Sequence, residues 1–467
     1  ALVVAAALTG FYTARLADER DRAETEATKA TEIATFLGTV FQNAGPSQAK
    51  GDSALVVDVL DRGAAEIRTE LAGRPEIQAA LMRIIGEVYT ELGRYGTADS
   101  LLSDALALLD NLESADPDDV ATASIALAQA RYFGGDFASV DSLYRRAVAI
   151  REASVGRDHP ETASALAHLA TNEYDTGRYT EADSLQRIVL DIRLRHLGPD
   201  DLSLAETYTS LSTLADLEGD LPRADSLAQR ALAIRRQHLT PPHWELAESL
   251  LLAGLARRNR GFLDEAEPLH QAALDMNREL YGDDHAEVGY VLNHLASLEY
   301  DREEFAAAER YAQDGLAVRR AALGPDHIEV GASLGNLARI QRAQGEIGRE
   351  REALDEMLRV IEGAVGTEHP FYGSVLQRIG TADAALGRPE NAERLLRRGL
   401  EIQRAALPDS APPLAIATRA LARFIGRRNP TEARALLDES ERICRAAVEL
   451  DPACVEKVRE TRTEAGL

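Results

Sequence analysis

One sequence feature constrains the fold of this chain most: residues of the same type recur every 42 positions over most of its length. The step runs from Pro75 to about Cys454 without an insertion, which makes nine tandem units. It is marked by His159, His243, His285, His327 and His369, and by Gly93, Gly135, Gly177, Gly219, Gly261, Gly345 and Gly387. A period of this length indicates a repeat architecture in which each unit packs only on its neighbours.

The composition indicates a folded, helical chain with an acidic surface. Hydrophobic residues make up 45% of the 467 residues and charged residues 28%, which is the balance of a folded protein rather than of a disordered tail. Alanine and leucine are abundant and aromatic residues are few, which favours helix throughout. The net charge of −25 disfavours contact with phosphate backbones. We therefore expect no nucleic-acid partner, whereas basic partners are compatible with this charge.

The unit that begins at Asp158 shows how each repeat is expected to fold. Apolar residues recur at helical spacing in two runs, and Gly177 separates them. Asp158 is expected to cap the first helix, with Pro160 in its first turn and Glu161 completing a capping box. Gly177 suits the left-handed residue that ends a helix, and Gly198 ends the second run. Each unit is therefore predicted to be helix, turn, helix and short loop.

Two slots, twelve residues apart, hold small side chains in most units. The first slot holds Gly86, Ala170, Gly254, Ala296, Ala338, Gly380 and Ala422, and the second holds Ala98, Ala182, Ala224, Ala266, Ala308 and Ala392. Small residues at fixed slots let two helices approach closely. We therefore expect the two helices of a unit to touch along these slots, for example at Ala170 and Ala182.

The small slots with a G-x-[YF] motif between them resemble the tetratricopeptide repeat, as in "GRYTEADSL" from Gly177. The longer unit and the "GPDH" joint at Gly324 resemble the kinesin-light-chain variety. The resemblance implies an all-α, right-handed superhelical solenoid of antiparallel helix pairs that binds proteins or peptides and is not an enzyme. It implies a degenerate half repeat over residues 51–74, nine repeats over residues 75–452, and a polar capping helix over residues 453–467. In the ninth repeat Asn429 replaces the glycine, so we expect a worn edge there.

The amino-terminal stretch "ALVVAAALTGFYTA" has no charge before Arg15. We interpret residues 1–14 as a truncated transmembrane helix, followed by a juxtamembrane helical segment over residues 15–50. The block from Phe36 to Tyr95 resembles the junction in bacterial serine/threonine protein kinases, where a cytosolic kinase domain precedes one transmembrane helix and then repeats. This resemblance implies a single-pass membrane protein with extracytoplasmic repeats.

The kinase activity would belong to a domain upstream of this chain, because its residues contain no glycine-rich phosphate loop, no "HRD" and no "DFG". The alternative is a soluble or secreted adaptor or regulator that has the same repeats and no kinase domain. We expect no catalytic residues and no cofactor in either case.

The repeated histidines are interpreted as markers of helix starts rather than as metal ligands. Equivalent helices of neighbouring repeats lie about 8–10 Å apart, whereas zinc needs several nitrogens that converge at about 2.0–2.1 Å. Proline, aspartate and alanine also occupy the histidine slot. We therefore expect no metal. Cys444 falls in a slot that holds isoleucine in other units, which favours a buried free cysteine, and its pairing with Cys454 stays open.

The resemblance places the binding surface on the concave face that the first helices of the units line. The slot that faces inward in this family holds Arg258, Tyr300 and Arg342 in three successive units, with Asn293 and Arg339 one slot earlier. A basic and aromatic stripe on an acidic chain suits a carboxylate-bearing segment. The competing interpretation is that each arginine offsets a helix dipole and pairs with a neighbouring carboxylate.

Overall fold

The computed structural model describes residues 52–71, 73–137, 139–409, 411–446 and 454–467. Within these residues the chain forms twenty α-helices and no strand. Successive helices pack as antiparallel pairs, so the predicted all-α solenoid of helix pairs is confirmed. The expected membrane helix over residues 1–14 and the segment over residues 15–50 lie outside the described residues. No described helix is both long and apolar enough to cross a membrane.

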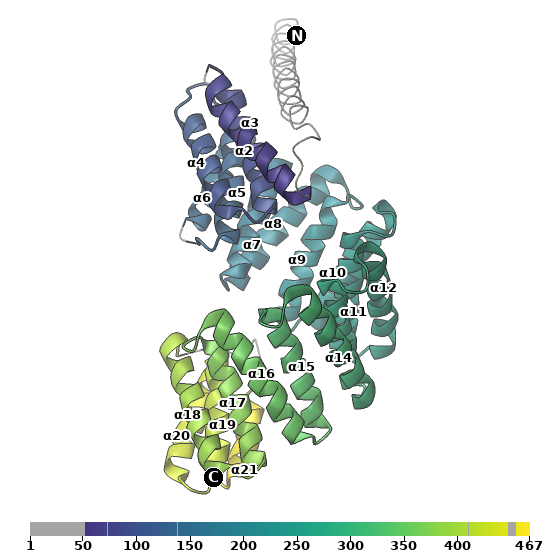
Figure 1. Cartoon of the computed structure of the whole chain (residues 1–467), viewed down its shortest axis with the longest axis vertical. Helices are drawn as coiled ribbons and strands as arrows, with labels where there is room; N and C mark the ends of the chain where they lie inside the picture. The colour runs from purple at the N-terminus through teal and green to yellow at the C-terminus, as the bar shows by residue number, and fades with distance from the viewer. Residues whose placement is uncertain (1–51, 72, 138, 410, 447–453) are drawn as a thin grey trace, which may run out of the picture. The chain divides into compact units, whose positions relative to one another are not determined.

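The chain divides into two compact units, Ala1–Gly198 and Pro199–Leu467. The described helices of the first unit are α2 (Asp52–Glu70), α3 (Pro75–Glu91), α4 (Tyr95–Asp110), α5 (Pro117–Phe133), α6 (Val140–Ser154), α7 (Pro160–Asp175) and α8 (Tyr179–Leu197) (Figure 1). Here α3 packs against α4, α5 against α6 and α7 against α8. The buried Tyr89 of α3 donates its hydroxyl to Asp61 of α2 at 2.6 Å, which ties α2 to the first pair.

The second unit contains six helix pairs and one further helix. Its helices are α9 (Ser203–Leu217), α10 (Leu221–His238), α11 (Trp244–Asn259), α12 (Leu263–Tyr281), α13 (Ala286–Asp301), α14 (Phe305–Leu323), α15 (Ile328–Ala343), α16 (Ile347–Val365), α17 (Pro370–Ala385), α18 (Pro389–Ala406), α19 (Pro412–Ile425), α20 (Pro430–Ala446) and α21 (Cys454–Ala465). α21 packs against both α19 and α20. Its Val458 and Thr461 are buried and its Glu456 and Glu460 are exposed, so one face of this last helix is polar.

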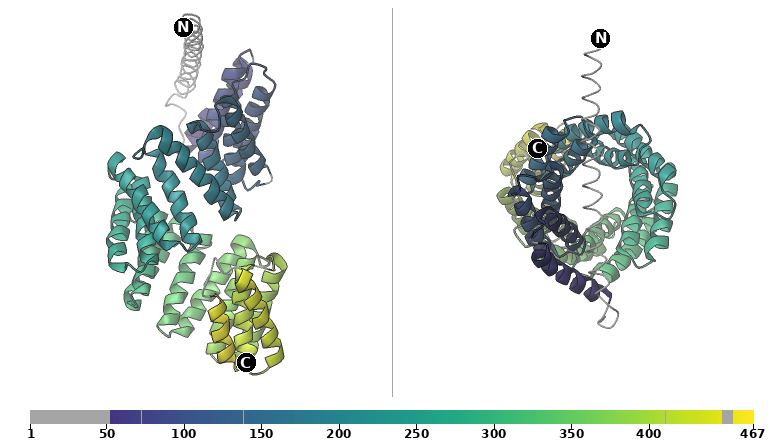
Figure 2. Two further views of the ribbon diagram at one scale, coloured as in Figure 1. Left: turned by 180° about the vertical axis from the view of Figure 1, so that it is seen from behind. Right: turned by 90° about the horizontal axis from the view of Figure 1, so that it is seen from above.

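The helix pairs of the second unit, drawn again in Figure 2, form two layers, and the contacts between helices assign the odd-numbered helices to one layer and the even-numbered helices to the other. Helix α11 contacts α9 and α13 in its own layer, and α13 contacts α15. No two neighbouring even-numbered helices of the described chain have comparable contacts. The odd-numbered layer is therefore the more tightly spaced one, as expected for the inner side of a curved array.

The repeated histidines are the N-cap residues of five odd-numbered helices. In each, the imidazole Nδ1 accepts a hydrogen bond of 3.2 to 3.3 Å from the backbone N–H two residues later. They thus mark helix starts, as the sequence predicts. The prediction that Asp158 caps α7 with Glu161 in a capping box is wrong, because His159 holds the N-cap position and Glu161 is the second helical residue. Asp158 instead pairs with Arg195.

The turn between the two helices of a pair contains a left-handed residue at the predicted slot. Gly177 has a φ of 80°, and Glu303, which replaces glycine in its repeat, has a φ of 63°. Glu303 is the one non-glycine residue with positive φ in the described chain. In the ninth repeat Asn429 does not take this conformation. Its side chain accepts a hydrogen bond from the Glu432 backbone N–H at 3.3 Å. The ninth repeat therefore departs from the others, as predicted, because Asn429 caps the next helix instead of forming a left-handed turn.

The small slots are buried between paired helices, and the side chain opposite the slot varies to fill the space. Ala170 and Ala182 are both fully buried, as predicted. At three repeats the first slot is glycine, and a larger side chain lies against it: Leu102 on Gly86, His270 on Gly254, and Leu396 on Gly380. A Cβ built on Gly254 would lie 2.8 Å from the His270 ring. Glycine is therefore required there by the size of its partner.

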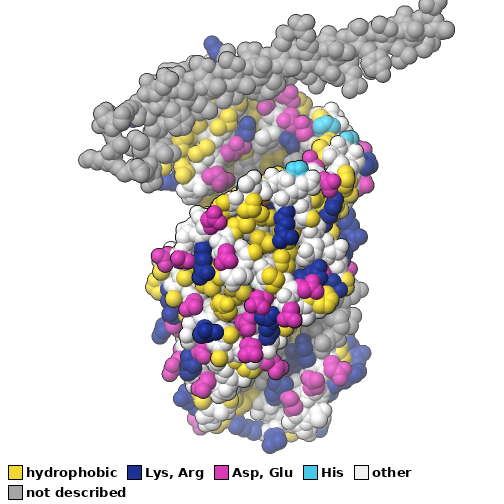
Figure 3. Space-filling model, turned by 90° about the vertical axis from the view of Figure 1, so that its right-hand side faces the viewer, with side chains coloured by type: hydrophobic (Ala, Val, Ile, Leu, Met, Phe, Trp, Pro, Cys, Tyr) yellow, Lys and Arg dark blue, Asp and Glu magenta, His cyan; other side chains and the backbone are white. Residues whose placement is uncertain are grey.

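Ion pairs join neighbouring repeats along the outside of the pairs. Arg302, at the end of α13, pairs with Asp264 and Glu267 of α12 at 3.0 and 2.8 Å. A second such pair joins Arg397 of α18 to Glu432 of α20, the next even-numbered helix, at 2.6 Å. On the face drawn in Figure 3, acidic and basic side chains are interspersed. The 77 acidic and 52 basic residues thus leave a surface that is acidic in total but locally mixed.

Candidate functional site

The predicted stripe lies on three inner-layer helices of the second unit. Its residues are Arg258 on α11, Asn293 and Tyr300 on α13, and Arg339 and Arg342 on α15. Arg339 and Tyr300 come together, since the guanidinium carbon lies 3.9 Å from the ring centroid, within cation–π range. Asn293 Nδ2 donates to Ser333 Oγ at 2.6 Å. Part of the stripe is thus a contact between neighbouring repeats.

The two outer arginines of the stripe have carboxylate partners inside the chain. Arg258 Nε donates to Asp301 Oδ2 at 2.7 Å, and Arg342 Nε donates to Glu350 Oε1 at 2.7 Å. The Glu350 side chain is only 2% exposed, so Arg342 points toward the interior of its own helix pair. These contacts agree with the competing interpretation that the arginines pair with neighbouring carboxylates. Binding of an acidic segment by this stripe stays a prediction.

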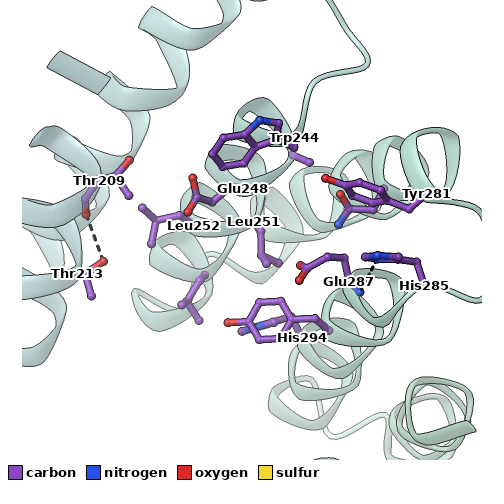
Figure 4. Close-up of a pocket in the computed structure, with 14 residues that line it drawn as sticks. Thr209, Thr213, Trp244, Glu248, Leu251, Leu252, Tyr281, His285, Glu287 and His294 are labelled. Atoms are coloured by element: carbon purple, nitrogen blue, oxygen red, sulfur yellow. Dashed lines mark hydrogen bonds between the residues drawn. The ribbon is translucent and has the colours of Figure 1, made fainter. Parts of the chain in front are cut away.

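A pocket of about 550 Å³ lies among α9, α11, α12 and α13, and the sequence analysis did not identify it. Its lining includes Trp244, Glu248 and Leu251 of α11, Tyr281 of α12, and Glu287 and His294 of α13 (Figure 4). Figure 4 shows the Glu287 carboxylate pointing toward Leu251, with Trp244 and Glu248 on one side of the space and His294 on the other. No lysine or arginine lines the pocket.

Three aromatic side chains border the pocket and remain accessible. Trp244 is 55% exposed, Tyr281 42% and Tyr290 41%. The Tyr281 ring stacks on the capping imidazole of His285 with 4.4 Å between centroids. Because His285 also accepts from the Glu287 backbone N–H at 3.3 Å, the start of α13 fixes both an aromatic and an acidic part of the pocket wall.

Two histidines are held neutral here: His294, which lines the pocket, and His270, which contacts His294 but is not part of the lining. His294 lies edge-on to Tyr290, with 4.7 Å between the centroids, and His270 lies behind it at 5.9 Å. Burial, with Arg258 and Arg319 nearby, lowers the pKa of His294 to about 4. Burial, with His294 nearby, lowers the pKa of His270 to about 3. The acidic side chains of the lining are Glu248 and Glu287, and the neutral His294 adds no positive charge beside them near neutral pH.

A buried arginine near the end of the even-numbered helices recurs at the repeat step. It is Arg151 in α6, Arg193 in α8, Arg235 in α10 and Arg319 in α14. Arg235 Nη1 donates to the backbone oxygen of Glu245 at 3.1 Å, and Arg319 Nη1 to that of Glu329 at 3.1 Å. The same guanidinium groups pair with the carboxylates of these glutamates at 3.3 and 3.1 Å. This arginine thus joins one repeat to the start of the next.

In α12, between these two repeats, the slot holds Asn277. Asn277 is 6% exposed and lines the pocket, and no described residue makes a hydrogen bond with its side chain. Glu287 stands where Glu245 and Glu329 stand, and no ion pair within 4 Å joins it to a described residue. Two signals in the sequence mark this place: the break in the arginine row at Asn277, and Trp244, the single tryptophan of the chain.

The described residues contain no group of three or more histidine, cysteine, aspartate and glutamate side chains placed to hold a metal. Cys444 and Cys454 form a disulfide between α20 and α21, with the two Cα atoms 5.4 Å apart, an ordinary separation for such a bond. Cys444 is fully buried, as its slot predicts, but the interpretation as a free cysteine is wrong. The bond forms because α21 folds back onto α20, which the period alone does not specify.

A family model described as the tetratricopeptide repeat matches residues 76–153, 161–237, 245–321 and 288–358, which together make up more than half of the chain. A search of curated protein sequences finds no match. The matched segments include α11, α12 and α13, and hence most of the pocket lining.

Several solved structures are similar to the chain. The apo form of RapI has a TM-score of 0.52 at 10% identity and covers 83% of this chain and 98% of its own. BtubC (BKLC) from P. vanneervenii has a TM-score of 0.44 at 22% identity, over 48% of this chain and 91% of its own. A putative kinesin light chain from Podosopora anserina has a TM-score of 0.38 at 21% identity, over 44% and 98%. At 10% identity, the likeness to RapI shows the fold alone.

Proposed function

The chain belongs to the tetratricopeptide repeat family and is a repeat scaffold for protein–protein interaction, and we propose that it binds a segment of a partner protein in the pocket among α9, α11, α12 and α13 without catalysing a reaction. The observation that carries the proposal is the accessible aromatic border, Trp244, Tyr281 and Tyr290, around a preformed pocket on the inner helix layer. Tryptophan and tyrosine are enriched among the few residues that contribute most of the binding energy of protein interfaces.

The test is to select peptides from a phage-displayed random library on the chain and to measure their affinities by calorimetry. Trp244→Ala is expected to weaken the selected peptides at least tenfold, which is about 1.4 kcal/mol or more of binding free energy. Ile328→Ala is the matched control, because Ile328 holds the same slot two repeats later and is 40% exposed. The proposal fails if no peptide is selected, or if the two variants bind equally well.

We further propose that the scaffold is the sensing or docking region of a membrane-bound bacterial serine/threonine protein kinase. The support is the resemblance of the block from Phe36 to Tyr95 to the junction in such kinases. Sequencing the gene upstream of Ala1 tests this proposal. A kinase core with "HRD" and "DFG" motifs in the same reading frame is expected. An upstream sequence without one leaves the alternative, a soluble or secreted adaptor or regulator.

We also propose that the repeats lie outside the cytoplasm, anchored through residues 1–14. The support is the Cys444–Cys454 disulfide, since such bonds persist in oxidising compartments and are rare in the cytosol. In cells lysed with excess maleimide under denaturing conditions, neither cysteine is expected to react until a reductant is added. Full labelling of both cysteines without reductant would overturn the proposal.

A further inference from the structure

The pocket exists where a repeated structural arginine is missing. In the repeats before and after, Arg235 and Arg319 place a guanidinium group against the first turn of the next odd-numbered helix. The shorter side chain of Asn277 does not reach Glu287, and the space that a guanidinium fills elsewhere is part of the pocket. In the neighbouring repeats the arginine also donates to a serine, Ser249 or Ser333. Val291 holds that slot here, so Glu287 is the acidic group that remains beside the space.

The groups around this space suit a cation. Glu287 has no ion pair within 4 Å among the described residues, whereas Glu245 and Glu329 at the same slot each have one. The second carboxylate, that of Glu248, forms an ion pair with Arg235, with 3.0 Å between Oε2 and Nη1. Arg319 lies over the Tyr290 ring, 5.3 Å from its centroid, and is engaged with Glu329. The pocket therefore presents one carboxylate, that of Glu287, which no described residue pairs with inside 4 Å.

The border of the pocket suits a flat cation in particular. A guanidinium group is planar, pairs with a carboxylate through two parallel hydrogen bonds and stacks on aromatic faces. Trp244, 55% exposed, and Tyr290, 41% exposed, line the same pocket as Glu287. Arg319 over the Tyr290 ring shows that this ring already receives a guanidinium group. An ammonium group has neither the bidentate geometry nor the flat face, so it matches this lining less well.

We propose that the pocket binds the arginine side chain of a partner protein, whose guanidinium takes the place next to Glu287 that Arg235 and Arg319 occupy in the neighbouring repeats. The inference rests on the proposed function, since it names the group that the same pocket receives. The partner thus supplies in trans the arginine that repeats on either side supply in cis. This also fits the acidic net charge of −25, which attracts basic segments.

The probe for the test is acetyl-arginine methylamide, with its citrulline and lysine counterparts. Citrulline keeps the shape of the side chain and removes the charge. Because Trp244 is the single tryptophan and lines the pocket, its fluorescence reports binding directly. A saturable change in fluorescence is expected with the arginine probe. The affinity for this probe should be at least tenfold higher than for the citrulline probe, and added salt should lower it. Lysine is expected to bind more weakly than arginine. Equal binding of the citrulline or the lysine probe would overturn the assignment.

Two variants and one matched control locate the contact. Glu287→Gln is expected to weaken the arginine probe at least tenfold. Glu329→Gln is expected to have no effect, because this carboxylate holds the same slot but already pairs with Arg319. Asn277→Arg restores the arginine of the neighbouring repeats and is expected to abolish binding while the helical content is kept. Unchanged binding in both Glu287→Gln and Asn277→Arg would contradict the inference, and Glu287→Gln alone decides it if Asn277→Arg does not fold.

The outcomes separate this inference from the proposed function. Selected peptides whose binding depends on Trp244 support the proposed function. If replacing their arginines by citrulline does not weaken this binding, the function stands and the inference is wrong. If the arginine probe binds through Glu287 but no peptide is selected, the pocket recognises the group and the proposed function is wrong.

Discussion

At the scale of single residues, histidine has two unrelated uses in this chain. The histidines at the repeat step accept a backbone hydrogen bond and begin helices. His270 is instead fully buried, and neither ring nitrogen has a hydrogen-bond partner among the described residues. Burial without a partner disfavours the charged imidazolium, so this residue resists protonation in the folded state.

This gives a pH prediction for His270. Its pKa is about 3 in the folded chain and about 6.5 in an unfolded one, so the unfolded state binds more protons below pH 6.5. Stability is then independent of this group above pH 6.5 and falls as the pH decreases toward 3. At pH 5 the loss is about 2 kcal/mol, from 1.36 kcal/mol per unit. The substitution His270→Leu is expected to remove this loss of stability. It places leucine against Gly254, as Leu102 and Leu396 lie against glycine in two other repeats.

Urea unfolding followed by Trp244 fluorescence measures this effect, because Trp244 lies on α11, the helix paired with the one that carries His270. The parent is compared with His270→Leu at pH 7.5 and pH 5. A variant that loses as much stability as the parent between these two conditions would show that another group is responsible.

At the scale of elements, the helix pair is the unit in which side-chain sizes are matched. The first small slot and the residue sixteen positions later face each other, so glycine stands against His270 or leucine, whereas Ala296 stands against Ala312. The small slots therefore set how closely two helices approach, and the size of the facing side chain compensates for the difference between glycine and alanine at the slot. A size change on one helix is predicted to be corrected by one change on the other.

Gly254→Ala tests this matching. The new Cβ would lie 2.8 Å from the His270 ring, and overpacking of this kind costs about 1–3 kcal/mol, more than the roughly 1 kcal/mol that alanine contributes to helix formation. Combined with His270→Ala, the pair becomes the alanine pair of Ala296 and Ala312, and the clash disappears. A double-mutant cycle is expected to give a favourable coupling of about 1–3 kcal/mol. Additive effects of the two substitutions would contradict the matching.

At the scale of the whole molecule, each repeat is held by its neighbours, so stability is expected to be local. The arginine slot, the inter-repeat ion pairs and the small slots all connect residues within one or two repeats. A chain built this way responds to damage first next to the damage. The disulfide adds a covalent link at one end only, between α20 and α21.

Replacing both Cys444 and Cys454 by alanine is expected to destabilise the carboxyl-terminal helices and little else. Loss of the link over a sequence separation of 10 residues corresponds to about 3 kcal/mol in the chain-entropy description. Amide hydrogen exchange should accelerate in α20 and α21, less in α19, and not in α11, which serves as the internal control. Uniform acceleration along the second unit would instead indicate a single cooperative core.

Much of the fold was readable in the sequence because its determinants are local. The glycines with positive φ and the helix starts each depend on a few consecutive residues, and the period of 42 residues repeats these local signals along the chain. The role of the histidines at helix starts was predicted for the same reason. The sequence did not predict that the histidine itself is the N-cap residue. Asp158 and His159 can both accept a hydrogen bond from the helix backbone, and only the backbone angles at the helix start decide between them.

The tertiary structure alone decided what depends on distance across repeats. The carboxylates that Arg258 and Arg342 bind, the Cys444–Cys454 bond and the pocket next to Asn277 all depend on side chains that meet only when one helix packs on another. The sequence by itself determined that this chain is an array of helix pairs, because regular spacing dictates regular packing. It did not determine where the array departs from regularity, because a single short side chain opens a pocket only through the space that its neighbours leave around it.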